Sequence, residues 1–388
     1  MVKRLISPSK SSSFFLFGAR ATGKSTWIEN EFITSLKKGQ FFQINLLDDE
    51  SEELYLKNPS VLVSQIEAMK PKPEWIIIDE VQKVPRLLDV VHKIIESKKI
   101  KFLLTGSSAR KLKLAGANML GGRAFDYRLF PFTHTELGQR FNLDEALNFG
   151  LLPKVYEFSE DVDKIKFLKS YVTTYIKTEV QMEQLVRKIE PFQNFLEIAA
   201  QMNGKLTNFL KISKEVGVDS KTIQSYYEIL EETYLGIRLP AYHNSIRKSQ
   251  LLTPKFYFFD TGIKRALDGS LRSPVVHGTS FYGETFEHFL ILEFVKMNSY
   301  FESDFRLSYF ATKDRSEIDL ILTRGREKIF VEIKSAKHID LTEVKKLAHY
   351  AKEEKAQAYY LSLDPIPQET DGVRCLPWDM GLKEIIKK

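Results

Sequence analysis

The chain has 388 residues, 43% of them hydrophobic, and a formal net charge of +6, which allows two or three globular domains with sizeable cores. Its apolar runs fall short of the roughly 18 residues that span a bilayer, so no membrane partner is predicted. The single cysteine, Cys375, excludes intrachain disulfides and cysteine-based zinc sites. These features predict a cytoplasmic protein, and the mild positive charge permits contact with a phosphate backbone without demonstrating it.

Residues 18–25 fit the phosphate-loop (Walker A) pattern G-x-x-x-x-G-K-[ST] without a mismatch. The apolar run 14–17 before them predicts a strand, and residues 26–30 after them can continue as a helix. In this setting the loop N–H groups surround a triphosphate, Lys24 reaches the β- and γ-phosphates, and Ser25 binds Mg²⁺. The sequence therefore predicts ATP and Mg²⁺ as cofactors. The predicted nucleotide-binding residues of this loop are Gly18, Ala19, Arg20, Ala21, Thr22, Gly23, Lys24, Ser25 and Thr26.

Three further apolar runs, 41–46, 75–79 and 102–106, alternate with helical segments. This alternation predicts a parallel sheet with helices on both faces. The second run ends in Asp79-Glu80, which resembles a Walker B pair. We expect Asp79 to bind the nucleotide's Mg²⁺ and Glu80 to activate the attacking water, the alternative being a solvated acidic cluster.

Two further candidates follow in the same region. Ser107, with Thr105 as second choice, stands after the next strand, where a polar side chain can sense the γ-phosphate; a plain turn is the alternative. Arg123 precedes a strand-like segment, 125–129, and is a candidate arginine finger acting across a subunit boundary. Otherwise it pairs with a nearby carboxylate.

The middle of the chain reads as helical. Thr133 and Glu136 have capping-box spacing, and a helical connector is predicted from Tyr171 onward. Helices near 195–202, 212–218 and 221–231 then form a helix-turn-helix pattern, with wing strands expected from 235–239 and 255–259. Such a module binds DNA or docks a protein, and both alternatives stay open. The predicted exposed face of its last helix comprises Lys221, Thr222, Gln224, Ser225 and Tyr226.

The C-terminal third begins after a Gly-, Ser- and Pro-containing boundary at 268–283. An amphipathic helix is predicted at 284–297, and two strands joined by a glycine turn are predicted at 316–323 and 328–334. The expected arrangement is therefore a helix followed by a β-hairpin.

Charged residues of this hairpin form a candidate second site. Glu332 and Lys334 point to the same face of one strand, and Asp319 on the paired strand can approach that face. Asp319 and Glu332 would share a Mg²⁺, Glu287 on the helix would complete the metal site, and Lys334 would stabilise charge on a scissile phosphate. This constellation resembles the PD-(D/E)xK restriction-endonuclease-like fold, in which cleavage can be lost while the shape is kept.

The chain as a whole resembles a prokaryotic AAA+-like P-loop ATPase family with a winged-helix region and a C-terminal restriction-endonuclease-like domain. The resemblance rests on the phosphate loop, Asp79-Glu80, residues 105–108, Gly122-Arg123, the helix-turn-helix stretch and the Asp319 cluster. It implies an α/β fold with an AAA+/ASCE parallel sheet, ATP hydrolysis, and a homo-oligomer with ring-like, for example hexameric, assembly. Thr178-Glu179 stands where such proteins often have an Arg-Asp pair, which departs from the pattern.

We therefore expect three domains: an AAA+-like ATPase at 1–142, a helical connector with a winged helix-turn-helix at 143–267, and a nuclease-like α/β domain at 268–388. The leading hypothesis is an ATP-driven DNA-processing protein that remodels or branch-migrates DNA, including branched DNA, with metal-dependent cleavage as an added activity. The alternative is a nucleotide-controlled switch or scaffold whose later domains bind proteins or DNA without cutting.

Overall fold

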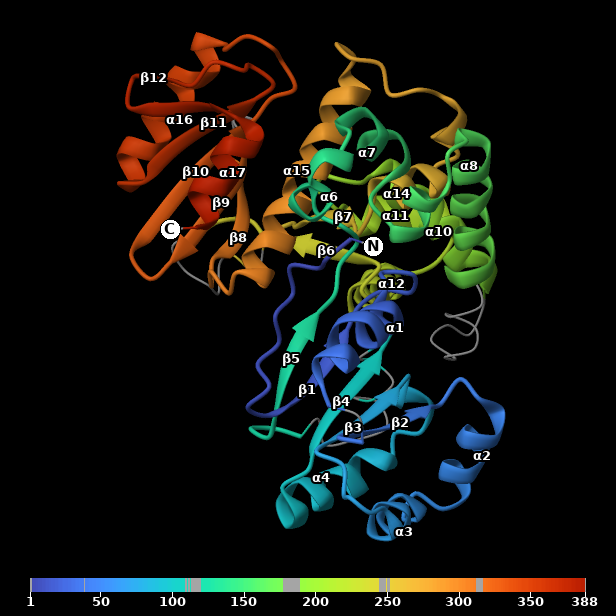
Figure 1. Ribbon diagram of the computed structural model, residues 1–388. Coiled ribbons are helices and arrows are strands. Elements are labelled where there is room, and N and C mark those ends of the chain that lie inside the picture. The colour runs from blue at the N-terminus through green and yellow to red at the C-terminus, as the bar shows by residue number, and fades with distance from the viewer. Residues whose placement is uncertain are drawn as a thin grey trace. The chain divides into compact units, whose positions relative to one another are not determined.

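The computed structural model describes residues 2–37, 39–108, 110, 112, 120–176, 189–243, 249, 252–311 and 317–387 (Figure 1). These residues form two compact units, Met1–Phe132 with Glu228–Leu235, and Thr133–Tyr227 with Gly236–Lys388. The Thr178-Glu179 pair lies outside the described residues, as does residue 316, at which the first strand of the hairpin was predicted to begin. No described helix has the length and apolar character that crossing a membrane requires.

The first unit is built on five parallel strands in the order β2-β3-β4-β1-β5. This confirms the predicted parallel sheet. In this order β4 lies between β1, which leads into the phosphate loop, and β3, which ends in Asp79, so three carboxyl ends meet at one edge of the sheet. The strands are β1 (Ser13–Phe17), β2 (Phe41–Asn45), β3 (Trp75–Asp79), β4 (Lys101–Gly106) and β5 (Ala124–Arg128).

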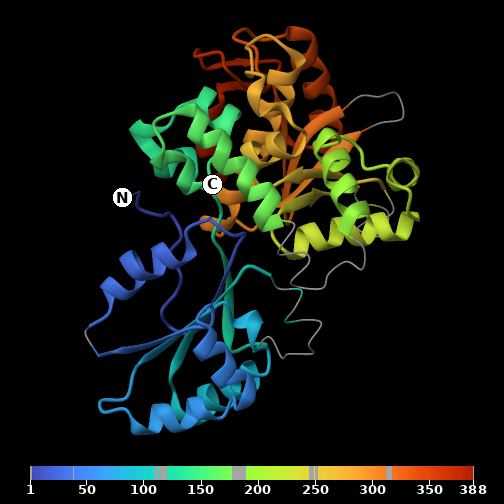
Figure 2. The ribbon, with the colours of Figure 1, turned by 90° about the vertical axis from the view of Figure 1, so that its right-hand side faces the viewer.

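Helices cover both faces of this sheet (Figure 2). Side chains alternate along a strand, so Phe15 and Phe17 point to the face covered by α2 (Asp49–Lys57), α3 (Val61–Ala68) and α4 (Leu87–Lys98). Phe14 points to the other face, where its ring centroid lies 5.6 Å from that of Phe32, in the helical turns that continue α1 (Lys24–Trp27). Burial on both sides explains why β1 and β3 are almost continuously apolar, whereas the edge strands β2 and β5 also carry exposed polar residues.

The second unit begins with a helical part. The predicted capping box is present, because Glu136 N donates to Thr133 Oγ1 at 3.1 Å and the Glu136 carboxylate accepts from Thr133 N at 2.8 Å. The segment predicted to be helical from Tyr171 is a π-helix as far as Ile176. The helices are α6 (His134–Leu137), α7 (Leu143–Phe149), α8 (Asp161–Ser170), α10 (Ile189–Gln201), α11 (Phe209–Val216), α12 (Ser220–Glu232) and α14 (Thr261–Leu267). Of these, α12 ends in the first unit, to which its residues from Glu228 onward belong.

Helices α10, α11 and α12 are accompanied by an antiparallel ribbon of β6 (Gly236–Leu239) and β7 (Lys255–Phe258). The prediction that Tyr226 is exposed on α12 is wrong, because its ring packs against Phe192 with a centroid distance of 5.0 Å and is 7% exposed. Tyr226 follows buried Ile223 by three residues and so extends the apolar stripe of the helix. Lys221, Gln224 and Ser225 are exposed.

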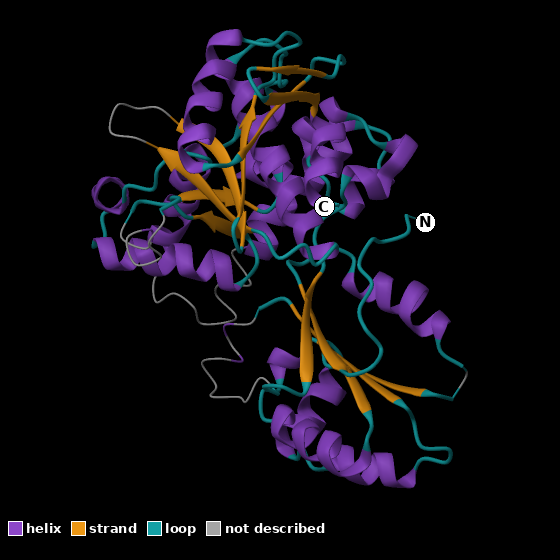
Figure 3. Cartoon of the chain, turned by 90° about the vertical axis from the view of Figure 1, so that its left-hand side faces the viewer, coloured by secondary structure: helices purple, strands orange, loops and turns teal. Residues whose placement is uncertain are grey.

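A six-stranded mixed sheet forms the rest of the second unit, in the order β12-β13-β11-β10-β9-β8 (Figure 3). The predicted hairpin is confirmed as antiparallel β9 (Glu317–Arg324) and β10 (Glu327–Ile333), and the preceding helix α15 (Ser280–Tyr300) begins four residues before Glu284. The elements not predicted are β8 (Arg306–Ala311), α16 (Leu341–Glu354), β11 (Gln357–Ser362), β12 (Gln368–Thr370), β13 (Val373–Pro377) and α17 (Trp378–Ile386).

A buried ionic group joins α6 to α15 within this unit. Glu293 is fully buried, and its Oε2 atom accepts from the backbone N–H of His134 at 3.0 Å and lies 2.5 Å from His134 Nδ1. The ammonium of Lys296 donates to Glu293 Oε1 at 3.1 Å. Burial raises the pKa of Glu293, but the charge of Lys296 and the contacts with His134 outweigh it and leave the pKa below its ordinary value.

Replacing Glu293 by Gln is expected to lower the free energy of unfolding by about 3–5 kcal/mol, because it removes a buried countercharge from Lys296. Urea unfolding measures this change. Glu353→Gln is the matched control, since Glu353 is exposed and pairs with exposed His349, and we expect a change within about 0.5 kcal/mol. Equal effects of the two substitutions would show that the buried group contributes nothing specific.

Candidate nucleotide site and a second acidic site

The phosphate loop depends on its two predicted glycines. Gly23 has φ +93°, a left-handed conformation, at the start of α1. Gly18 has no room for a side chain, because an added Cβ would lie 2.3 Å from the carbonyl oxygen of Leu129. Lys24 is buried, and its ammonium donates to the carbonyl oxygens of Gly18 at 2.8 Å and Ala19 at 3.2 Å. The loop therefore wraps around the lysine that was predicted to reach the phosphates.

The other predicted loop residues complete this segment. Thr22 is buried and its Oγ1 donates to Ala19 O at 2.8 Å. Ala21 adopts φ +59° although it is not glycine, which marks a tightly constrained turn. Arg20 is partly exposed, and Thr26 lies exposed on the first turn of α1.

The Asp79 carboxylate accepts hydrogen bonds from hydroxyl groups on two different elements. Ser25 Oγ on α1 donates to Asp79 Oδ2 at 3.1 Å, and Thr105 Oγ1 on β4 donates to Asp79 Oδ1. Asp79 is 6% exposed, so its carboxylate is held in place by these contacts. A hydroxyl and a carboxylate brought together in this way are the oxygen donors that Mg²⁺ prefers.

Glu80 is held by a separate network. Its backbone has φ +58° and ψ +48°, an uncommon conformation for a residue with a side chain, and its N–H donates to Thr105 Oγ1 at 3.0 Å. Its carboxylate accepts from Ser107 Oγ at 3.2 Å and from the amide of Gln82, which also donates to Ser107 Oγ at 3.1 Å. Ser107, predicted as a γ-phosphate sensor, thus contacts Glu80. Gln82 was missed, because no local pattern distinguishes it from its polar neighbour Lys83.

Arg123 forms the intrachain pair that was the alternative to an arginine finger. Its Nη2 and Nε lie 2.6 and 3.0 Å from Glu96 Oε1. It precedes the first residue of β5, which runs parallel to β1, so it lies at the sheet edge opposite the phosphate loop. Arg123 therefore cannot reach the nucleotide site of its own first unit, and a role in hydrolysis needs another copy of the chain.

Asp319, Glu332 and Lys334 meet on the mixed sheet. The pairing of Leu320 with Val331, continued by one step, sets Asp319 opposite Glu332, and Asp319 Oδ2 accepts from Ile333 N at 2.7 Å. Lys334 Nζ donates to Glu332 Oε1 at 2.6 Å, so both side chains occupy the same face as predicted. Both carboxylates are buried, with exposures of 8% and 4%.

Burial and neighbouring charges set the electrostatics of this second site. Burial, followed by the charges of Glu332 and Glu287, raises the pKa of Asp319 well above its ordinary value. Burial also raises the pKa of Glu332, although Lys334 opposes the change. Two buried carboxylates with oxygen donors are a set that a hard divalent ion fits, because the ion offsets their mutual repulsion.

Glu287, predicted as a third ligand, is engaged elsewhere. It accepts from Tyr257 OH at 2.6 Å and from Lys255 Nζ at 3.2 Å, although its charge acts on Asp319. Among the described residues, no three His, Cys, Asp or Glu side chains converge in the manner of a metal site. A cavity of about 400 Å³ adjoins these carboxylates, and Lys255, which also lines it, is the second residue that the prediction missed.

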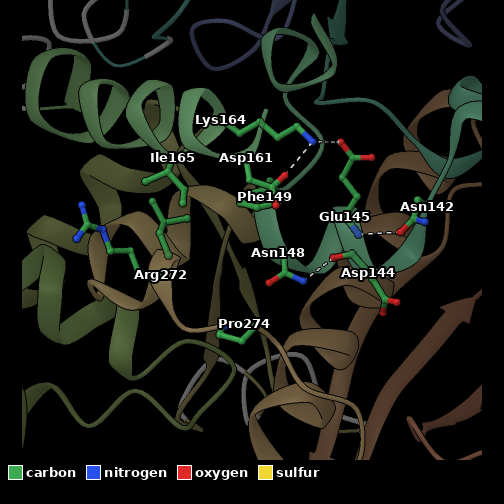
Figure 4. Close-up of a pocket in the computed structure, with 11 residues that line it drawn as sticks. Asn142, Asp144, Glu145, Asn148, Phe149, Asp161, Lys164, Ile165, Arg272 and Pro274 are labelled. Atoms are coloured by element: carbon green, nitrogen blue, oxygen red, sulfur yellow. Dashed lines mark hydrogen bonds and ion pairs between the residues drawn. The ribbon is translucent and has the colours of Figure 1, made fainter. Parts of the chain in front are cut away.

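A larger cavity of about 670 Å³ lies between α7, α8 and residues 271–274. Figure 4 shows the Lys164 ammonium directed at Glu145 and Asp161, at 2.7 and 3.4 Å. The charge of this buried lysine is thus paired within the cavity wall. The residues that line this cavity come from three separate segments, which explains why no sequence motif predicted it.

Comparison with known proteins divides the chain into three matched segments. Residues 10–138 match a family model described as an AAA domain. Residues 140–273 and 282–380 match two domains of unknown function, DUF8612 and DUF4143. With the five-stranded parallel sheet and the phosphate loop, this makes the first segment an AAA-type P-loop domain, which indicates nucleotide hydrolysis.

The similar curated proteins are themselves described as uncharacterized. One from Mycobacterium tuberculosis (strain H37Rv) is 22% identical over 67% of this chain and 58% of its own length. One from Haemophilus influenzae (strain Rd) is 22% identical over 81% of this chain and 80% of its own. The chain thus spans less than two thirds of the mycobacterial relative.

Two solved structures are similar over parts of their length. The replication initiator DnaA, bound to AMPPCP and single-stranded DNA, covers 57% of this chain and 82% of its own at 12% identity, with a TM-score of 0.30. Protein VC1899 from Vibrio cholerae covers 90% of this chain and 97% of its own at 13% identity, with a TM-score of 0.20.

Proposed function

We propose that this chain is an ATP-hydrolysing, AAA-type DNA-processing protein. The observation that carries the proposal is the meeting of Lys24, Ser25, Asp79 and Glu80 at the carboxyl edge of one parallel sheet. This edge is where ligands bind in open α/β sheets.

In the proposed reaction the loop N–H groups and Lys24 hold the β- and γ-phosphates of ATP. Ser25 and Asp79 would hold Mg²⁺, which would supply positive charge against the phosphates. Glu80 accepts the proton of the attacking water, and its strained backbone together with Ser107 fixes the direction of its carboxylate. Arg123 completes the site of a neighbouring copy in a homo-oligomeric ring, after leaving Glu96.

DNA is the proposed substrate for two reasons. The exposed Lys221, Gln224 and Ser225 offer a cation and polar groups on one helix, as DNA contacts require. The Asp319, Glu332 and Lys334 cluster offers oxygen donors and an ammonium for Mg²⁺-dependent cleavage of a phosphodiester. Movement of these parts during ATP turnover would remodel the bound DNA.

A second candidate function is a nucleotide-controlled switch that binds DNA or proteins without cutting. One observation favours it: the carboxylates of the second site are tied to lysines, and no three-residue metal cluster is preformed among the described residues. Under this alternative, nucleotide binds tightly and turnover is negligible.

ATP turnover is expected to rise on addition of DNA and to lose this stimulation as salt is raised, because phosphate contacts weaken steeply with ionic strength. Steady-state ATPase assays with single-stranded, duplex and branched DNA measure the effect. Lys221→Glu should reduce the stimulation, whereas Lys352→Glu on the exposed surface of α16 should not. Turnover that is identical with all three DNAs and without DNA would contradict the proposal.

A further inference from the structure

The second acidic site contains an internal cation supplied by another part of the fold. Lys255 lies on β7 of the ribbon that follows the helix-turn-helix segment, whereas the carboxylates lie on α15, β9 and β10. Its ammonium is 3.2 Å from Glu287 Oε1 and also pairs with Glu317 Oε1. The Lys255 side chain is 5% exposed, against 36% for Lys334.

The Lys255 ammonium faces a cavity wall that carries more negative than positive groups. The lining residues carry six carboxylates and four lysine ammonium groups, which leaves two negative charges in excess. Two of the pairs are peripheral, because Lys205 meets Glu284 at 3.8 Å and Lys346 meets Glu343 at 3.6 Å. Around Asp319 and Glu332 the wall is therefore richer in carboxyl groups than in ammonium groups.

Lys255 acts on the same carboxylates that such a cation would use. Burial lowers the pKa of Lys255, but the charges of Glu287, Asp319 and Glu317 outweigh it and raise the pKa. The ammonium is held between its two direct partners, Glu287 and Glu317, on the wall of the cavity that Asp319 also lines. A buried ammonium in this position repels an incoming metal ion and occupies Glu287.

We propose, on the basis of the proposed metal site, that Lys255 is a positioning residue that competes with a divalent cation for Glu287 and Asp319. Its charge keeps the cation affinity of the resting protein low.

The test is a titration of the full chain with Mn²⁺, without nucleotide, followed by calorimetry or by the electron paramagnetic resonance of the free ion. Lys255→Met is expected to lower the Kd for Mn²⁺ by at least about tenfold, because a unit charge next to the site is removed. Lys255→Gln should give the same gain while keeping a hydrogen-bond donor. Lys255→Arg, which keeps the charge, should behave as wild type.

Lys205→Met is the matched control, because it removes one ammonium from the same cavity wall without touching Glu287 or Glu317. Its effect is expected to stay below about threefold, since an exposed charge is largely screened. Adding Asp319→Asn to Lys255→Met should abolish the gain. Thermal melting of each variant verifies that it is folded.

Three results would overturn the inference: equal affinities of wild type and both neutral variants, equal gains in Lys205→Met and Lys255→Met, or no Mn²⁺ binding by any variant. Cleavage of labelled DNA by the same proteins separates this inference from the proposed function. An affinity gain without cleavage in any variant supports the role of Lys255 and rejects nuclease activity. Cleavage that depends on Asp319, without an affinity gain, supports nuclease activity and rejects the role of Lys255.

Discussion

Replacing Glu80 by Gln is expected to lower ATP turnover by about two to four orders of magnitude while ATP still binds. The amide has the shape of the carboxylate and can still accept from Ser107, but it cannot take the proton of the attacking water. Lys24 and Asp79, which are proposed to hold ATP and Mg²⁺, are unchanged. Single-turnover hydrolysis and equilibrium binding of a fluorescent ATP analogue measure the two effects separately.

Two companion variants make this test specific. Lys24→Met is expected to abolish binding as well as turnover, because it removes the cation of the loop. Gln82→Ala should reduce turnover less than Glu80→Gln, since Ser107 still donates to Glu80 when the amide is lost. A Glu80→Gln protein that hydrolyses ATP at the wild-type rate would mean that another group activates the water.

The residues of the candidate nucleotide site could be picked out from the sequence because their signals are local. The phosphate loop is one continuous segment, and Asp79-Glu80 follows directly on an apolar strand. The position of β4 between β1 and β3 could not be predicted from the sequence, since strand order depends on contacts between distant segments. That order is what brings Thr105 to Asp79 and Ser107 to Glu80.

The second site likewise combines residues that the sequence predicted with one that it did not. Asp319, Glu332 and Lys334 belong to one hairpin, whose short turn fixes the register, so spacing alone predicted that they meet. Lys255 reaches them from β7, across a sequence separation that no local pattern encodes. The prediction that Tyr226 is exposed was wrong for a related reason. On α12 this residue continues the apolar stripe, and its ring packs against Phe192 on another helix.

Replacing Asp319 by Ala or Lys334 by Ala is expected to lower Mg²⁺- or Mn²⁺-dependent cleavage of DNA by about a hundredfold or more. Asp319 would lose its place as a metal ligand, and Lys334 would no longer stabilise charge on the scissile phosphate. Both side chains are fixed on one face of the hairpin, so neither is easily replaced by a neighbour. Gel assays with end-labelled junction DNA, with and without metal, measure the loss.

Loss of cleavage must be separated from loss of folding. Asp319→Asn serves this purpose, because its amide oxygen can still accept from Ile333 N and because burial and the charges of Glu332 and Glu287 already raise the pKa of Asp319. Removing the negative charge therefore relieves repulsion, and this variant should stay folded but inactive. Asp371→Asn, in the exposed turn between β12 and β13, is the control that should cut normally. Cleavage that persists in both the Asp319 and the Lys334 variants would place the cutting site elsewhere, in this chain or in a contaminant, and would leave the second site as a binding surface.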